Sequence, residues 1–334
     1  MNVKGTHMQK ATFMGNSPID ILQESPLEKI SEYGLKLGDF QGTDADTIHR
    51  IQNECGEETL CPGGAVANTT WSLGMLGHKA NFIGRVGDDK AGNMFFNSME
   101  SAGITMPKPE AGKKSMEIRV LVTPNGERTF ATTGIPAPMT ADFVPHNLIT
   151  ESDWLFVEGY LLLDPNQVDA VKESIQTARN AGLKIAMTLA TVAVMDVAFD
   201  HLAEEVIGHV DLIIGNEDEY RALIHAAENY KHEAADLLAQ KLQKTPRLVT
   251  HGEKGASFLD SEGNKTFEPC PPVAEVLDTT GAGDAFLAGF LDGFLQDKPI
   301  AECLKQGHAI ASMVVQQFGG RYPHVGAHLY ENVA

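Results

Sequence analysis

The segment that decides the fold is Asp278-Thr279-Thr280-Gly281-Ala282-Gly283-Asp284-Ala285-Phe286-Leu287-Ala288-Gly289-Phe290. Phe286, Phe290 and, further on, Phe294 recur every four residues, which places them on one face of a helix. Gly281, Ala282 and Gly283 should form the entry to this helix, where backbone N–H groups lack intrahelical acceptors and attract anions. Asp284 is therefore a carboxylate in the first turn of an anion-binding helix end. The simplest interpretation is that it offsets the helix dipole.

Length and composition are those of an ordinary globular protein. The chain has 334 residues, enough for one large α/β domain with an insertion or for two domains, and 43% of its residues are apolar. A formal net charge of −19 argues against nucleic-acid binding. No apolar run approaches the length of a membrane span, and the four cysteines form neither a metal-ligand pattern nor a disulfide scaffold. We therefore expect a cytoplasmic protein with reduced thiols. The first ten residues are excluded from the prediction of the fold, because Gly5-Thr6-His7-Met8 looks like a cloning junction.

Strand and helix patterns alternate along most of the chain. Strands are expected at 11–14, 79–86, 154–161, 184–189, 210–214 and 247–249, and a second β-rich patch at 256–267. Helices are expected at 65–76, 91–102, 165–181, 194–207, 217–227, 232–242, 286–295 and 300–317. This alternation predicts a three-layer αβα sandwich with a mostly parallel sheet covered by helices on both faces.

Two stretches interrupt the alternation. Residues 118–122 and 128–131 flank Pro124-Asn125-Gly126-Glu127, a strong hairpin signal, and an inserted hairpin is most simply a lid. Residues 24–58 are polar and acidic without strong periodicity, so we interpret them as peripheral and partly extended. The predicted division is a core of residues 11–23, 57–112 and 136–334, with a β lid from part of 24–56 and from 113–135.

Ligands bind beyond the carboxyl ends of parallel strands, so the loops there are the candidate site. These loops are 15–20, 62–68, 216–219, 250–255 and 280–284. The sequence contains no Gly-x-x-x-x-Gly-Lys-Ser/Thr, and Gly281-Ala282-Gly283 lacks the third glycine of the dinucleotide fingerprint. It also contains neither His-Glu-x-x-His nor Gly-x-Ser-x-Gly. P-loop hydrolysis, hydride transfer, zinc proteolysis and α/β-hydrolase chemistry are therefore disfavoured.

Three motifs in order carry a resemblance to a known family. Gly63-Gly64-x-x-x-Asn68, Asn216-x-x-Glu219 and the 278–284 motif together resemble the PfkB/ribokinase-like small-molecule kinases over nearly the whole chain. Gly15-Asn16-x-x-x-Asp20 and Val157-Glu158-Gly159-Tyr160-Leu161 are similar to its bacterial adenosine kinase branch. The resemblance implies an enzyme that uses ATP and Mg²⁺ to phosphorylate a primary hydroxyl beneath a lid of inserted strands.

The resemblance assigns catalytic roles that agree with the chemistry of phosphoryl transfer. The backbone N–H groups of Gly281, Ala282 and Gly283 would stabilise the transferring group, and Asp284 would accept the proton of the substrate hydroxyl. Arg128, just after the hairpin turn, resembles an arginine that reaches the transferred phosphate. The alternative for Arg128 is an ordinary solvated side chain.

Substrate binding is assigned to the two early loops and to Glu158. Gly63 and Gly64 would let the backbone approach a ligand, and Asn68 would offer a donor and an acceptor. Asp20 would accept hydrogen bonds from two vicinal hydroxyls. Asn16 could equally belong to a turn, and Asp20 could be a surface residue.

The nucleotide and metal assignments rest on the later loops. Asn216, Thr250, Gly252, Gly255, Gly281 and Gly283 would bind ATP. Asn216 and Glu219 would hold Mg²⁺ mostly through water, although the same residues satisfy a helix cap. Asp278 and Thr280, with the backbone near Gly319, match positions that hold a monovalent cation such as K⁺ in many members. His251 is not expected to be catalytic.

The expected function is phosphorylation of the 5′-hydroxyl of adenosine, which forms AMP in purine salvage. A ribokinase- or fructokinase-like sugar kinase and a non-catalytic nucleoside-binding paralogue are the alternatives. We expect small-molecule partners, no nucleic acid and no membrane, and either a monomer or a homodimer joined through the lid.

Overall fold

The computed structural model describes residues 8–124, 126–232, 235–317 and 319–321, so residues 5–7 of the suspected cloning junction lie outside it. The main sheet has the strand order β13-β12-β11-β10-β9-β8-β1-β5. Its strands are β1 (Ala11–Met14), β5 (Ala80–Ile83), β8 (Trp154–Glu158), β9 (Lys184–Thr188), β10 (Leu212–Asn216), β11 (Arg247–Thr250), β12 (Ala256–Leu259) and β13 (Lys265–Glu268). The run from β5 to β11 is parallel, and β12 and β13 are antiparallel additions at one edge.

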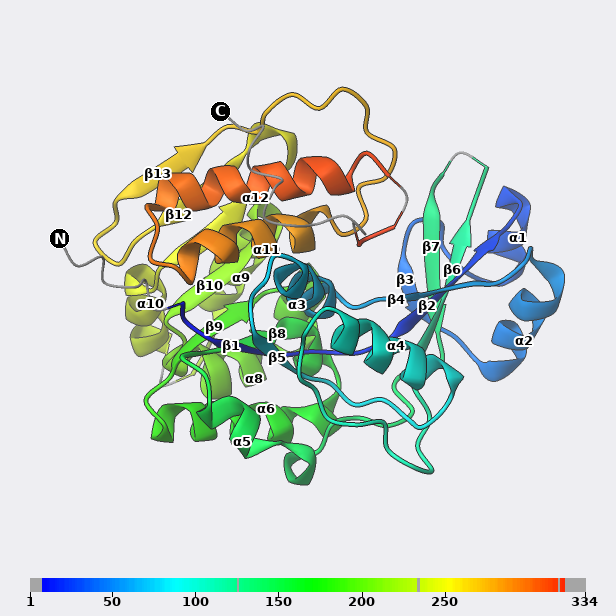
Figure 1. Cartoon of the computed structure of the whole chain (residues 1–334), viewed down its shortest axis with the longest axis horizontal. Helices are drawn as coiled ribbons and strands as arrows, with labels where there is room; N and C mark the ends of the chain where they lie inside the picture. Colours follow the sequence, from blue (N-terminus) through cyan, green and yellow to red (C-terminus); the bar gives the residue numbers. More distant parts are fainter. Residues whose placement is uncertain (1–7, 125, 233–234, 318, 322–334) are drawn as a thin grey trace.

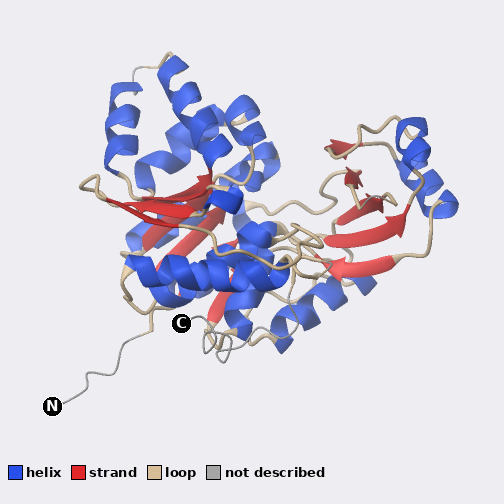
Figure 2. Cartoon of the chain, turned by 90° about the horizontal axis from the view of Figure 1, so that it is seen from above, coloured by secondary structure: helices blue, strands red, loops and turns tan. Residues whose placement is uncertain are grey.

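Helices cover both faces of this sheet, as Figure 2 shows from above. One face packs against α3 (Ala65–Met75), α4 (Lys90–Ser101), α11 (Ala282–Phe294) and α12 (Ile300–Val314). The other packs against α5 (His146–Thr150), α6 (Pro165–Asn180), α7 (Val192–Val197), α8 (Phe199–His201), α9 (Glu217–Asn229) and α10 (Ala235–Lys244). This is the expected three-layer αβα sandwich with a mostly parallel sheet.

The strands alternate their side chains between the two cores. Phe13 and Phe156 lie in the α3–α11 core, stacked with ring centroids 4.7 Å apart. Met14 and Val157, the next residue on each strand, lie in the opposite core. Because both faces are covered, the neighbouring strands β5, β1 and β8 are buried at every residue, which explains why their sequences are mostly apolar.

A second sheet stands beside the main one, to the right in Figure 1. Its strand order is β3-β7-β6-β2-β4, from β2 (Ile19–Glu24), β3 (Phe40–Gly42), β4 (Thr59–Pro62), β6 (Glu117–Val122) and β7 (Arg128–Thr132). The hairpin is therefore β6–β7, as expected. The division of the chain differs from the prediction, because β2 and β4 pair in this sheet although residues 11–23 and 57–112 were assigned to the core.

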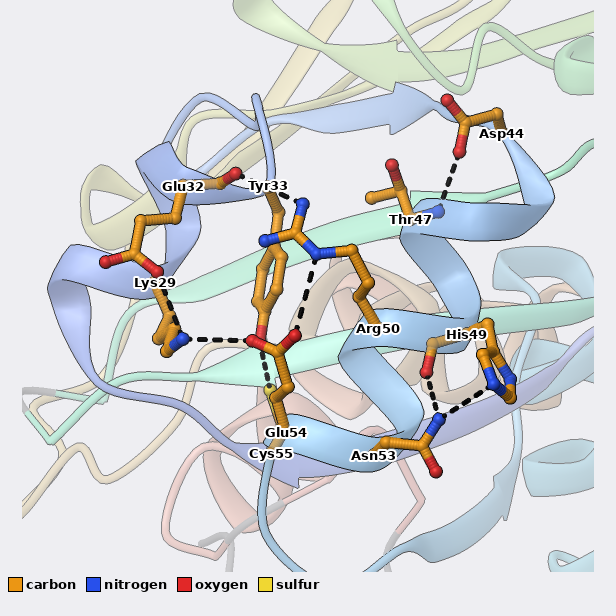
Figure 3. A network of polar contacts seen from close by, with 10 residues as sticks. All are labelled: Lys29, Glu32, Tyr33, Asp44, Thr47, His49, Arg50, Asn53, Glu54 and Cys55. Carbon is orange, nitrogen blue, oxygen red and sulfur yellow. Dashed lines mark hydrogen bonds and ion pairs between the residues drawn. The ribbon is translucent and has the colours of Figure 1, made fainter.

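Residues 24–58 are peripheral but more helical than expected. They form α1 (Leu27–Glu32) and α2 (Ala45–Glu54), and Ile30 and Ile51 are buried against Leu121 and Ala131 of the second sheet. Polar contacts tie the two helices together in Figure 3, where Lys29 Nζ lies 2.9 Å from Glu54 Oε2. The large apolar residues of α2, Ile48 and Ile51, share one face of the helix, but two such residues in a polar segment are too few to identify a helix from the sequence.

The segment expected to be one helix at 194–207 is broken. After α7 and α8 the chain forms a π-helical turn at Leu202–Val206 and a 3₁₀ turn at Ile207–His209. Val194 and Val206 are both buried in the broken form, so the apolar residues alone carried no sign of the breaks. No helix of the described residues is long and apolar enough to cross a membrane.

Candidate active site

The predicted site loops meet at the carboxyl ends of the parallel strands β1, β8, β9, β10 and β11 of the main sheet. Asn68, on the first turns of α3, donates from Nδ2 to Asp284 Oδ2 over 3.1 Å. Asp284 is in the first turn of α11, so the acid and the early Gly-Gly loop face the same space. The expected convergence of these two motifs is confirmed.

Helix α11 begins with the backbone geometry that the two glycines permit. Gly281 is the N-cap with φ 73°, and a Cβ there would lie 2.5 Å from Gly320 Cα. The Ala282 N–H donates to Thr279 O, at 3.2 Å, so it is not available to a ligand. Among the described residues, the N–H groups of Gly281 and Gly283 have no acceptor. Two of the three predicted amide donors are therefore free at this helix end.

Asp20 is held against the glycine loop. A Cβ at Gly63 would lie 2.5 Å from Asp20 Oδ2, and a Cβ at Gly64, where φ is 91°, would lie 2.7 Å from Asn16 O. Burial raises the pKa of Asp20 to about 6, against the opposing effects of the Arg321 and Arg128 charges. Both positions thus require glycine because other residues of the protein, Asp20 and Asn16, pack closely against them. From the sequence, a ligand was expected there instead.

The pKa of the Asp284 carboxyl is raised, and the main cause is its burial. Burial and, to a lesser extent, the neighbouring charges of Glu158 and Asp20 together raise this pKa to about 7, while Asn68 and Arg321 oppose the shift. A group whose pKa lies near neutrality can exchange a proton with a substrate at physiological pH. The geometry and the pKa of Asp284 therefore suit a proton acceptor.

Glu158 lies behind the site instead of facing a ligand. Its side chain is 1% exposed, and its two oxygens accept from the backbone N–H groups of Asn16 (2.8 Å) and Val66 (3.2 Å). Burial raises its pKa to about 7. Glu158 therefore ties the 15–20 loop to the start of α3, which corrects its prediction as a substrate contact. The side-chain oxygen of Asn16 accepts from Gln167 at 3.2 Å.

A cavity of about 150 Å³ runs from Asp284 to the ends of β9, β10 and β11. Gly283, Asn216, Glu219 and Thr250 line it, together with Thr188, whose buried hydroxyl has no hydrogen-bond partner in the described part of the chain. No motif in the sequence pointed to Thr188.

Asn216 and Glu219 form a reciprocal capping box at the start of α9. The Glu219 N–H donates to Asn216 Oδ1 at 2.9 Å, and Asn216 N and Nδ2 donate to the two Glu219 oxygens at 3.0 and 2.8 Å. Burial raises the pKa of Glu219. The cap and the predicted metal role are compatible, because each carboxylate oxygen has a further lone pair. The described residues contain no cluster of three or more His, Cys, Asp or Glu placed to hold a metal directly.

A larger cavity, of about 520 Å³, opens on the other side of the start of α11. Four of the residues predicted to bind ATP line it, namely Thr250, Gly252, Gly255 and Gly283, whereas Asn216 and Gly281 do not. Its apolar wall was not expected from the sequence. That wall comprises Pro271, Pro272, Val273, Val276, Phe286, Ala311 and Val315. His251 bonds to Ser257 at 2.9 Å and does not line this cavity.

Arg128 and Asp278 form an ion pair that joins the second sheet to the segment before α11. The Asp278 carboxylate also accepts from Gly319 N at 2.8 Å and from Thr280 N at 2.9 Å. Burial acts to raise the pKa of Asp278, but these hydrogen bonds and the Arg128 charge outweigh it and lower the pKa. The Asp278 carboxylate thus already has a cationic partner, so this arrangement does not fit a monovalent cation.

Arg321 is a site residue that the sequence analysis did not find. Its Nε donates to Asn68 Oδ1 at 2.9 Å, and its charge acts on both Asp20 and Asp284. Burial lowers its pKa to about 10, which leaves it charged at neutral pH. The one feature of the sequence that could have pointed to Arg321 is that it directly follows Gly319-Gly320. Gly320 packs closely against Gly281 at the start of α11, which brings the next residue to the site.

Comparison with known proteins places this geometry in a family. The chain is 27% identical to the adenosine kinase of Saccharomyces cerevisiae over 330 residues, which cover 93% of this chain and 96% of that protein. It is also 27% identical to a 5-dehydro-2-deoxygluconokinase of Listeria monocytogenes over 268 residues, which cover 76% of this chain and 81% of that protein.

Solved structures share the fold along its whole length. The adenosine kinase of Sinorhizobium meliloti superposes with a TM-score of 0.84 at 27% identity, covering 98% of this chain and 100% of that one. A probable sugar kinase of Rhizobium etli has the same TM-score at 24% identity, covering 97% and 98% of the two chains. The fold is thus ribokinase-like. Residues 27–325 match the family described as "pfkB family carbohydrate kinase", and the chain belongs to this family.

Proposed function

We propose that the protein phosphorylates the 5′-hydroxyl of adenosine with ATP and so forms AMP, a purine-salvage reaction. The observation that carries the proposal is the convergence of Asp284, Asn68 and Asp20 on one space beside the free N–H groups that start α11. Two relatives of nearly full length, from Saccharomyces cerevisiae and Sinorhizobium meliloti, are adenosine kinases.

In this proposal each group has one task. Asp20 accepts hydrogen bonds from the two ribose hydroxyls, and Asp284 accepts the proton of the 5′-hydroxyl as that oxygen bonds to phosphorus. The N–H groups of Gly281 and Gly283 bind the transferring phosphoryl group; removing one such donor typically costs about 2.7–4 kcal/mol of transition-state stabilisation. The cavity of about 520 Å³ beside Gly252 and Gly255 receives the nucleotide.

Magnesium fits the residues that face the smaller cavity. The Glu219 carboxylate lines it, and a Cβ at Gly215 would come within 2.8 Å of Glu219 Oε2, so a glycine is needed there. Asn216 and Glu219 would hold a hydrated Mg²⁺, which neutralises phosphate charge when bound.

A sugar kinase is the second candidate, because 5-dehydro-2-deoxygluconokinases are also among the relatives. The test is ADP release with adenosine, ribose, fructose and 5-dehydro-2-deoxygluconate as acceptors. Turnover with adenosine is expected; turnover with a sugar or sugar acid and none with adenosine would replace the nucleoside assignment.

The role of Asp284 is tested by Asp284→Asn. The amide keeps the shape of the side chain, so nucleoside binding measured by calorimetry should stay within a few-fold of the wild type. Turnover should fall by about 10²–10⁴-fold, the usual contribution of a general base. Undiminished turnover would remove Asp284 from the mechanism, and binding with no turnover in the unaltered protein would indicate a non-catalytic paralogue.

A further inference from the structure

Arg321 makes contacts that link it to the proposed base through one intermediate. Its Nε donates to Asn68 Oδ1 at 2.9 Å, and Asn68 Nδ2 donates to Asp284 Oδ2 at 3.1 Å. A guanidinium can only donate hydrogen bonds, so the oxygen of the Asn68 amide must face Arg321. The amino group of that amide then faces Asp284. An ionised Asp284 carboxylate, which can only accept, favours the same orientation, and Arg321 fixes it from the other end of the amide.

The guanidinium itself is held firmly. Nη1 donates to Ser98 Oγ at 2.7 Å, and the guanidinium carbon lies 5.5 Å from the ring centroid of Trp71 and 5.8 Å from that of Phe95. These contacts come from α3 and α4, which belong to the main core. Arg321 can therefore act as a rigid support for Asn68.

A purely structural role does not account for Arg321. Its Nη2 is buried and has no hydrogen-bond partner among the described residues, an unfavourable arrangement for a charged donor. No carboxylate of the described residues forms an ion pair with it, although Asp20 and Asp284 are close enough for their charges to act on it. The contacts of the described residues therefore do not satisfy every donor of this buried cation.

We propose that Arg321 is a positioning residue of the phosphoryl-transfer site: it fixes the Asn68 amide and, through it, the Asp284 carboxylate. This rests on the proposed function, in which Asp284 is the base. Asn68 then occupies one carboxylate oxygen and leaves Oδ1 for the substrate hydroxyl. The positive charge of Arg321 also favours the ionised form of Asp284, which is the form that accepts a proton.

The test compares Arg321→Met, Arg321→Lys and the control Arg50→Met. Methionine keeps the apolar contact with the rings but has no donor, whereas lysine keeps the charge and one donor. Arg50 also lies over a ring, at 5.1 Å from the centroid of Tyr33, but on helix α2 away from the site (Figure 3). Arg321→Met should lower kcat by up to about 100-fold, as for a misplaced reacting group, with a partial recovery in Arg321→Lys. Arg50→Met should leave kcat unchanged.

Two readouts separate positioning from mere packing. The pKa of Asp284, followed by ¹³C NMR of the substrate-free protein, should rise in Arg321→Met, and the acidic limb of the kcat/KM profile should move to higher pH with it. The other titratable groups near Asp284 are Asp20 on β2, Glu158 on β8 and Tyr160 beyond it. Because the Arg321 charge also acts to lower the pKa of Asp20, the ¹³C signals of Asp20 and Asp284 are followed separately. The effects of Arg321→Met and Asn68→Ala should also be less than additive.

The opposite results would overturn the proposal. An unchanged Asp284 titration in Arg321→Met, with only a lower melting temperature, would make Arg321 structural. Fully additive effects with Asn68→Ala would mean that it does not act through Asn68. The NMR titration needs no turnover, so it decides the role of Arg321 even if Asp284→Asn shows that Asp284 is not the base.

Discussion

Gly63→Ala is a small change with a large expected effect on substrate binding. The new Cβ would lie 2.5 Å from Asp20 Oδ2 and 2.7 Å from Asp20 Cγ. The backbone of Gly63 cannot easily retreat, because its N–H donates to Pro18 O at 2.9 Å and β4 is paired with β2 just before it. The Asp20 carboxylate must therefore move by about 0.9 Å to reach the ordinary contact distance of 3.4 Å.

That displacement is enough to lose a charge-assisted hydrogen bond to the substrate. Such bonds contribute about 1.5–3 kcal/mol, which corresponds to an increase in KM of about 10- to 150-fold. The phosphoryl side of the site is untouched, so kcat should change much less than KM. The assay is initial-rate ADP release with adenosine, supported by calorimetric titration.

Two controls make the result specific. Gly208→Ala adds the same methyl group at a position with ordinary φ and nothing within 4 Å, so it should leave KM unchanged. In an Asp20→Ala background, Gly63→Ala should have little further effect on KM. A wild-type KM in Gly63→Ala, or a full additional effect in Asp20→Ala, would refute the role assigned to Asp20.

Three further predictions concern stability and the second sheet. Burial raises the pKa of Asp284 to about 7, so its folded form retains a proton that the unfolded chain has lost, and this group makes the protein less stable as pH rises towards 7. In urea titrations, the unfolding free energy of Asp284→Asn should therefore rise relative to that of the wild type between pH 3.8 and about pH 7 and stay level above, and a relative fall would contradict the pKa shift. Gly289→Ala would place a Cβ 2.4 Å from Gln306 O, where α11 meets α12, so thermal unfolding should show a destabilisation of about 3 kcal/mol, whereas an unchanged melting temperature would argue against this close helix contact. Arg128→Met removes the ion pair with Asp278, so β6 and β7 should exchange amide hydrogen faster, and unchanged exchange would mean that this pair does not hold the second sheet.

Much of the architecture was predictable because the strands and helices of the main domain carry strong, long patterns. The start of α11, the β6–β7 hairpin and the common edge of the site loops all follow from local signals. The membership of β2 and β4 in the second sheet did not, because pairing partners depend on contacts between distant segments. Deleting residues 113–133 to test whether they form a lid would therefore also remove β6, the strand that pairs with β2. Arg128→Met leaves this pairing in place and is the more specific test.

The site was predictable in its motifs but not in its connections. Glu158 was found, yet the sequence could not show that its oxygens are used by the two backbone N–H groups of neighbouring loops. Arg128 and Asp278 were assigned to different partners, whereas the structure pairs them with each other. Arg321 belongs to no motif that we recognised, since its role depends on the packing of α3 against the end of the chain.

The ambiguity of Asp284 is resolved by two other helices of the same chain. Asp44 and Asp89 are N-caps whose carboxylates accept from the N–H groups of Thr47 and Gly92. The bond from Thr47 lowers the pKa of Asp44; burial acts to raise the pKa of Asp89, but the bonds from Gly92 and Ser115 outweigh it and lower the pKa. A carboxylate that serves a helix end is thus stabilised in its charged form. Asp284 shows the reverse, because burial raises its pKa to about 7, although it stands in the first turn of α11. It is not the cap, which is Gly281, and its side-chain partner among the described residues, Asn68, is itself held by Arg321. A role at the helix dipole does not account for this burial, which agrees with the proton-acceptor role that we propose for Asp284.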